Sequence, residues 1–372
     1  MNEKKDSEQE EFFKNWKYCP RCGAKIPETE KTIRYCYSCG LQFENFPYII
    51  EKSFKPPESI KLTEKEINED PELAPWTPRA SLIWPILSIF IMNTVVIIPF
   101  TFIVFFIPNI SKLMEFIASP LFLIIFSVSE FVFMIIPLIY VGQYLERSSL
   151  KNRLKILGIF IQRPKIQFLG KELLLGIGFA ILGFFLVNLI SFLLELLVNP
   201  FYIFPNIFTA QAPSVDIDSI ISSAGLFEII LLVIVMILVI GLSEEVAFRG
   251  FMQKGLVKEF GKELGIWITA IIFAIIHIVT IFLTLSPLSI LRSFLLLFPP
   301  YLFLSLLLGY LFYWRKSNLI APIVAHGVYD AITVLLVYIV YQHFTFLLLF
   351  LLILGIVLIL SFFLYYLLER YY

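Results

Sequence analysis

The sequence predicts an all-α fold: a polytopic membrane bundle of about eight transmembrane helices with a small N-terminal zinc-ribbon domain. Hydrophobic residues make up 59% of the chain and include 39 Phe, whereas soluble domains hold about 45–50% apolar residues. These residues are grouped in segments long enough to cross a bilayer. The four cysteines all lie within residues 19–39, in two C-x-x-C pairs.

Composition and charge also limit the partners. Only 16% of the residues are charged, and the formal net charge is zero. A basic surface for nucleic acid is therefore not expected. Residues 1–18 are charged and lack the apolar stretch of a secretory signal, so membrane insertion should depend on internal segments. We expect an integral, multi-pass protein of a microbial plasma membrane, with the lipid bilayer as its first partner.

The N-terminal part begins with a charged tail, residues 1–18, followed by a predicted Cys₄ zinc ribbon at residues 19–42. Each C-x-x-C pair is followed by Gly, which allows a tight turn around a metal, and four thiolates can close a tetrahedron around structural zinc. Two disulfides are the alternative, but they require an oxidising compartment. The predicted zinc ligands are Cys19, Cys22, Cys36 and Cys39.

Residues 43–80 predict a linker, because six prolines lie among charged residues. A short helix is expected in its middle, between Ile60 and Glu69. The ribbon and linker together suit contact with a partner or substrate, and a simple stabilising role is the alternative. The prolines are Pro47, Pro56, Pro57, Pro71, Pro75 and Pro78.

Residues 81–368 hold the predicted transmembrane helices. The boundaries of the fifth to seventh are the least defined, because Pro287, Pro299 and Pro300 lie among them. The predicted spans are 82–107, 119–145, 170–198, 225–248, 265–285, 293–314, 319–341 and 344–368.

The distribution of Lys and Arg predicts the orientation. Basic residues occupy the turns after the second, fourth and sixth spans, whereas the loop at 199–224 has neither Lys nor Arg. By the positive-inside rule those basic turns are cytosolic, and so are both termini.

Residues 243–249, at the end of the apolar run from Leu226, contain two adjacent carboxylates and an arginine. A charge at the centre of a membrane helix costs about 2.5–3.5 kcal/mol, so such residues are functional candidates. Glu245 and Arg249 are four residues apart and can form an ion pair. Glu244 has no such partner and suits a general base. Alternatively, all three charges only anchor the helix end.

Two later spans add polar groups at comparable depth. His277 lies in the fifth span, and His326 and Asp330 share a face of the seventh. We expect these residues to form one site with Glu244. Glu130, in the second span, suits either a proton path or a hydrogen bond to a neighbouring helix.

Two chemistries fit this set. In one, Glu244 and His277 deprotonate a water that attacks a peptide carbonyl, while His326 with Asp330 stabilises the oxyanion. In the other, Glu244, His277 and His326 bind a catalytic zinc. The usual H-E-x-x-H motif of zinc proteases is not present in the sequence.

The ordered motifs Glu244-Glu245-x-x-x-Arg249, Phe273-x-x-x-His277 and His326-x-x-x-Asp330 resemble those of the CAAX protease and bacteriocin-processing (CPBP/Abi) family of intramembrane proteases. The resemblance covers roughly residues 80–368 and implies a similar eight-span layout.

The resemblance implies that Glu244 and His277 activate the water, that Glu245 and Arg249 are a structural pair, and that His326 and Asp330 form the oxyanion side. It implies an endopeptidase acting near the cytosolic leaflet on a peptide or a CAAX-like or lipid-modified protein. The last motif position is Asn in the prenyl-protein proteases and Asp330 here. Because an ionised Asp cannot donate a hydrogen bond, this difference counts against a prenyl-protein substrate.

Two non-enzymatic readings remain open. A transporter or receptor would use the same polar groups for protons or ligands, although the paired inverted repeats with broken helices of many transporters are not evident here. A scaffold would use them only to hold helices together.

Overall fold

The computed structural model describes residues 61–106, 110–162, 165–198, 217–282 and 287–371. The chain divides into two compact units, Met1–Glu58 and Ser59–Tyr372. The charged tail and the predicted ribbon with its four cysteines lie outside the described residues. All regular elements of the described part are helices, which confirms the predicted all-helical fold.

Seven helices of the described part are long and apolar enough to cross a membrane, one fewer than the eight spans expected. The remaining predicted segment, 265–285, corresponds to a helix, α14 (Lys262–Phe282), that is not among the seven. The seven candidate spans are Pro78–Val95, Pro120–Tyr144, Lys165–Leu197, Leu226–Phe260, Phe294–Trp314, Ile320–Gln342 and Phe344–Arg370. The chain is therefore an integral, multi-pass membrane protein.

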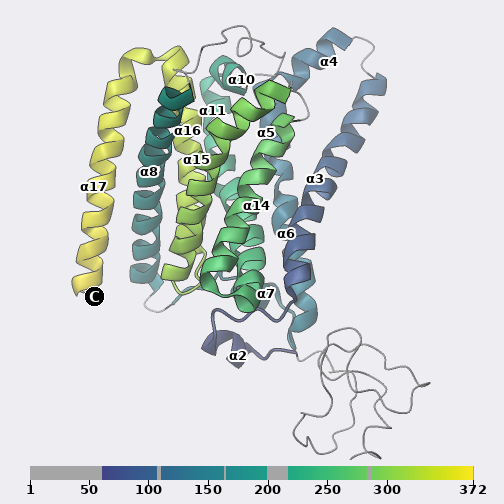
Figure 1. Cartoon of the computed structure of the whole chain (residues 1–372), viewed down its shortest axis with the longest axis vertical. Helices are drawn as coiled ribbons and strands as arrows, with labels where there is room; N and C mark the ends of the chain where they lie inside the picture. The colour runs from purple at the N-terminus through teal and green to yellow at the C-terminus, as the bar shows by residue number, and fades with distance from the viewer. Residues whose placement is uncertain (1–60, 107–109, 163–164, 199–216, 283–286, 372) are drawn as a thin grey trace, which may run out of the picture. The chain divides into compact units, whose positions relative to one another are not determined.

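The first half of the described chain forms two long helices with shorter helices between and before them (Figure 1). Its elements are α2 (Glu64–Glu69), α3 (Pro78–Phe106), α4 (Ile110–Ile117), α5 (Pro120–Ser129), α6 (Phe131–Val141), the 3₁₀ turn η2 (Gly142–Tyr144), α7 (Leu150–Ile156) and α8 (Lys165–Val198).

The second half supplies the helices that carry the polar residues. Its elements are α10 (Ile217–Ser223), α11 (Leu226–Val235), η4 (Met236–Ile240), α12 (Gly241–Glu245), η5 (Val246–Gln253), α13 (Lys254–Phe260), α14 (Lys262–Phe282), α15 (Pro287–Trp314), α16 (Ile320–Gln342), η6 (Phe344–Phe346) and α17 (Leu347–Tyr371).

The fourth span is a composite helix. From Leu226 to Phe260 it runs through α11, η4, α12, η5 and α13, and both η4 and η5 are π-helical. A π-helical turn leaves backbone groups outside the regular i→i−4 pattern, and such turns are frequent at functional sites. The short helix between the two π-helical turns carries Glu244 and Glu245.

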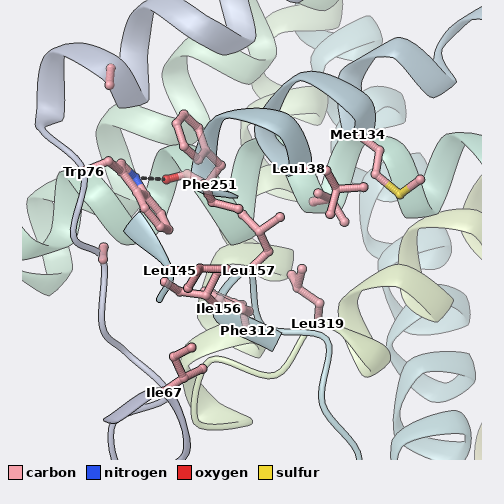
Figure 2. Close-up of a cluster of buried hydrophobic side chains, with 14 of the residues drawn as sticks. Ile67, Trp76, Met134, Leu138, Leu145, Ile156, Leu157, Phe251, Phe312 and Leu319 are labelled. Atoms are coloured by element: carbon pink, nitrogen blue, oxygen red, sulfur yellow. Dashed lines mark hydrogen bonds between the residues drawn. The ribbon is translucent and has the colours of Figure 1, made fainter. Parts of the chain in front are cut away.

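The second half of the predicted 43–80 linker is packed against the helical domain rather than extended. Leu62, Ile67, Ala74 and Trp76 are buried in a cluster that includes side chains of α6, η5 and α15, part of which Figure 2 shows. The Leu62 N–H donates to Tyr144 O over 2.8 Å. Apolar residues spaced among prolines are therefore core residues here. Ile67 is buried on a short helix, whereas Leu62, Ala74 and Trp76 are buried outside any regular helix.

The short helix expected in this segment is α2. Thr63 caps it in a capping box: the Thr63 N–H donates to Glu66 Oε2 over 2.8 Å. This backbone hydrogen bond, with one from the Thr63 hydroxyl, holds the pKa of the Glu66 carboxyl below its ordinary value.

Basic segments distant in the sequence meet at one end of the bundle. Leu319 N donates to Gly158 O over 2.9 Å, which joins the end of α7 to the turn before α16. The buried Lys254 Nζ donates to Ile156 O over 2.7 Å. The C-terminal end of α17 lies at the same end of the bundle as α7 (Figure 1). This clustering agrees with the charge pattern from which the cytosolic face was predicted.

Replacing Trp76 with Phe tests whether this packed segment stabilises the fold. The Trp76 indole stacks on Phe251 with ring centroids 4.8 Å apart, and its N–H donates to the Phe251 carbonyl over 3.1 Å (Figure 2). Phe keeps the stacking but removes the indole hydrogen bond to that carbonyl, which still accepts from the Lys254 N–H, so we expect a loss of about 0.5–1.5 kcal/mol in the free energy of unfolding. Thermal unfolding in detergent measures it. Trp314→Phe, at a half-exposed position, is the control, and equal effects of the two changes would contradict the prediction.

Candidate active site

The predicted polar residues converge from three parts of the chain. Glu244 and Glu245 lie on α12 with Arg249 on η5, Phe273 and His277 lie on α14, and His326 and Asp330 lie on α16. Their side chains are linked by the contacts described below.

Glu245 and Arg249 form the expected ion pair. Arg249 Nη1 donates to Glu245 Oε1 over 2.6 Å, and both side chains are fully buried. The other guanidinium nitrogen, Nη2, donates to Ser305 Oγ over 2.9 Å. The guanidinium also lies 4.6 Å from the ring centroid of Phe273, a cation–π distance. A buried arginine with this many contacts holds α14 and α15 against the fourth span.

Glu245 has a second role that the sequence did not indicate. Its Oε1 also lies 2.8 Å from His326 Nδ1. Because a carboxylate only accepts hydrogen bonds, Nδ1 carries the proton, and the ring is fixed with Nε2 turned the other way. His326 Nε2 then faces Glu244 Oε2 at 3.7 Å and Asp330 Oδ2 at 3.5 Å. Glu245, rather than Asp330, makes the short contact that orients His326.

His277 is held by the first residue of its own motif. Its Nδ1 lies 2.8 Å from the Phe273 carbonyl oxygen, which accepts the Nδ1–H. Its Nε2 therefore faces Glu244 Oε2, 3.6 Å away. The imidazole lies close to the ring of Phe273, centroid to centroid 4.1 Å, and to that of Tyr301 at 5.0 Å. Phe273 thus supplies both a carbonyl and a ring to position the histidine.

Glu244 Oε2 is the point on which both histidines converge. Its distances of 3.6 and 3.7 Å to the two Nε2 atoms exceed a direct hydrogen bond. Only 6% of the Glu244 residue surface is exposed, so the carboxylate works away from bulk solvent. A carboxylate and two imidazoles around one point can activate and orient a water.

The catalytic-zinc alternative requires Glu244, His277 and His326 as ligands. Among the residues that the structure describes, no group of three or more His, Cys, Asp or Glu side chains is arranged to hold a metal ion. Glu244, His277 and His326 are not grouped as such a ligand set in the described part of the chain.

Sequence reasoning missed Ser305 and Tyr301 on α15, because neither is unusual in an apolar helix. Their roles depend on Arg249 and His277, which approach from other helices. It did single out Glu130, whose side chain lies within interaction range of Glu244. The signal for Glu130 was an ionisable residue within an apolar membrane-spanning segment.

Two glycines set the distance between the glutamates and His326. A Cβ added to Gly327 would lie 2.7 Å from Ile237 Cα, and one added to Gly241 would lie 2.7 Å from Gly327 N. The backbones of the fourth span and α16 are therefore in direct contact, one residue after His326 and three before Glu244. No side chain fits between them.

Replacing Gly327 with Ala should separate these two helices. We expect a loss of roughly 1–3 kcal/mol in the free energy of unfolding and weaker alignment of His326 with Glu244. The measurement is thermal unfolding in detergent, with peptidase turnover assayed below the transition. Gly355→Ala on α17 is the matched control, because an added Cβ there meets nothing within 4 Å. A Gly327→Ala protein as stable and active as Gly355→Ala would contradict this account of the crossing.

Residues 226–332 match the family model described as type II CAAX prenyl endopeptidase Rce1-like. That segment contains both glutamates, Arg249, both motif histidines and Asp330. Searches of curated proteins and of solved structures gave no match. The segment 226–332 of this membrane protein is thus similar to the Rce1-like endopeptidases, and the chain is an enzyme of the peptidase class.

Proposed function

We propose that the chain is an intramembrane endopeptidase that hydrolyses a peptide bond near the cytosolic leaflet, using a water activated by Glu244 and His277. The observation that carries this proposal is the position of Glu244 Oε2, 3.6 and 3.7 Å from the Nε2 atoms of His277 and His326. The substrate class is a peptide or protein with an apolar or lipid-modified segment, because the site lies among membrane helices.

The first step forms the tetrahedral intermediate. Glu244 accepts a proton from the water at Oε2, and the water oxygen forms a bond to the peptide carbonyl carbon. The carbonyl π electrons move to the oxygen, which becomes an oxyanion. His277 Nε2 orients the water, since its Nδ1–H is committed to Phe273 O.

His326 is the proposed oxyanion donor. Because its Nδ1–H is bound to Glu245, it can donate through Nε2 only as an imidazolium. Glu245 and Asp330 place a counter-charge near each ring nitrogen, at 2.8 and 3.5 Å. In this scheme Asp330 is ionised and acts on the charge of His326, so it needs no proton of its own. In this scheme the residue at position 330 does not donate a hydrogen bond to the oxyanion, so Asp can occupy the position that is Asn in the prenyl-protein proteases.

The second step breaks the peptide. The C–N bond cleaves as the oxyanion returns its electrons to the carbonyl, and the proton held by Glu244 passes to the leaving amine. The product is a carboxylic acid and a free amine, and the Glu244 carboxylate is restored. Glu245, Arg249 and Ser305 hold the geometry and exchange no proton.

The transporter and scaffold readings are less well supported. The Rce1-like match to residues 226–332 points to a peptidase, and a scaffold has no need for Glu244 Oε2 to face two histidines. The basic segments gathered at one end of the bundle support a cytosolic position for that end and for the C-terminus.

Replacing Glu244 with Gln tests the enzyme proposal. Gln has nearly the same volume and cannot accept the water's proton, so we expect kcat to fall about 10²- to 10⁴-fold with thermal unfolding unchanged. The assay uses reconstituted protein and paired peptides, with and without a prenyl group on the C-terminal motif cysteine.

Comparing membrane peptides from cells with active and Glu244→Gln enzyme identifies an accumulating native substrate. Glu228→Gln is the control, because Glu228 caps the start of α11, away from the site. Peptide cleavage by Glu244→Gln at the rate of the unchanged protein would exclude the proposed role.

The N-terminal cysteines remain the proposed structural zinc site. Metal analysis of the purified full chain should find about one zinc per molecule, as expected for a closed Cys₄ site. A Cys19→Ser, Cys22→Ser double variant should lose this zinc and keep peptide cleavage, since no proposed step involves the ribbon. Zinc retained by the double variant would contradict the assignment, as would a chain without zinc.

A further inference from the structure

Glu130 occupies a break in the second candidate span. It ends α5 and starts α6: its N–H donates to Ser127 O over 3.2 Å, and its carbonyl accepts from Phe133 N over 2.9 Å. A carboxylate at this depth is costly unless it has a partner. No step proposed above uses it.

The packing of α6 places Glu130 opposite Glu244. Phe133 lies one turn after Glu130, and Phe248 lies one turn after Glu244, so each pair shares a face of its helix. The rings of Phe133 and Phe248 are in contact, with centroids 6.2 Å apart. The two glutamates therefore face each other one turn along the same interface, independently of any contact between their own side chains.

The two carboxyl groups lie within interaction range of each other, close enough for a side-chain hydrogen bond. Within the described part of the chain, their Oε2 atoms are buried and have no hydrogen-bond partner. Ionised carboxylates only accept hydrogen bonds, so a hydrogen bond between two of them requires one proton between the pair. Two adjacent ionised carboxylates in a low-dielectric site would repel each other strongly.

We infer that Glu130 and Glu244 share one proton, and that Glu130 is the positioning residue that turns Glu244 Oε2 toward the two histidines. This inference rests on the proposed function of Glu244 and deepens it. Glu130 holds the shared proton and donates it as a hydrogen bond to one oxygen of Glu244, so Glu244 stays ionised and its Oε2 remains the acceptor for the proton of the water. Glu130 contributes from a span outside the 226–332 match.

Other charged or titratable groups near this pair come from neighbouring helices. Arg249 on η5 is within electrostatic range of Glu244. Asp330 on α16 is within electrostatic range of Glu130. Tyr301 on α15 is within electrostatic range of Glu244. His277 and His326 face Glu244 Oε2 directly. The pH dependence of activity therefore includes contributions from these groups, and only variants at Glu130 isolate the shared proton.

Two substitutions at Glu130 separate positioning from packing. Glu130→Leu keeps the volume and removes the hydrogen bond, so we expect kcat to fall about 10- to 100-fold, the size of a lost hydrogen bond to a charged group, with little change in KM. Glu130→Gln keeps a donor to Glu244, so kcat should fall only a few-fold. Activity of the unchanged enzyme should decline at alkaline pH as the shared proton is lost, and this decline should be weaker in Glu130→Gln, which cannot titrate.

Infrared spectroscopy of the full chain in membranes gives a readout independent of turnover. The unchanged protein should show the C=O band of a protonated carboxyl at neutral pH, and Glu130→Gln should lose intensity there. Glu115→Gln, on the exposed face of α4, is the control and should not change the band.

The outcomes distinguish the two proposals. If Glu244→Gln is inactive while Glu130→Leu retains full activity and an unchanged pH profile, the shared proton is wrong and the endopeptidase proposal stands. An equal loss of activity in Glu130→Leu and Glu130→Gln would also overturn the shared-proton inference, since Gln should retain most of the activity that Leu loses. If Glu244→Gln is fully active, the proposed function itself fails.

Discussion

The site depends on one buried carboxylate, that of Glu245. Its Oε1 accepts from Arg249 at 2.6 Å and from His326 at 2.8 Å, so one oxygen atom joins η5 to α16. Arg249 in turn reaches Ser305 on α15 and the Phe273 ring on α14. Removing one member of a buried ion pair typically costs about 3–5 kcal/mol, because the other charge stays buried without a partner. The orientation of His326 therefore depends on the same atoms that hold four helices together.

The backbone geometry of the fourth span and α16 allows Glu244 and Glu245 to contact the same histidine. On a regular helix Glu244 and Glu245 point about 100° apart, yet they face opposite nitrogens of one imidazole. The ring lies between them because α16 crosses the fourth span in direct backbone contact at Gly241 and Gly327. The π-helical turns on both sides of α12 interrupt the regular helix at this crossing. Irregular backbone in a membrane helix is tolerated where neighbouring protein covers it.

Much of the candidate site was predictable, because charges within apolar segments are costly and therefore conspicuous. Glu244, Glu245, Arg249, His277, His326, Asp330 and Glu130 were all singled out on that basis, and the Glu245–Arg249 pair followed from their spacing. The division of roles around His326 was not predictable. Asp330, four residues away on the same helix, was expected to act with His326 on the oxyanion side, whereas Glu245 from another helix makes the shorter contact to the ring. Ser305 and Tyr301 carry no charge, so only their neighbours in space give them a role.

The sequence by itself determined the all-helical membrane fold and the polar residues of the site, because burial in lipid restricts composition and segment length. It also indicated which end of the bundle is basic. Tertiary structure decided that residues 62–76 belong to the helical core, since isolated apolar residues among prolines have no periodicity to reveal them. It also decided which oxygen of which glutamate faces each histidine. Contacts between helices far apart in sequence depend on crossing geometry, which no local pattern encodes.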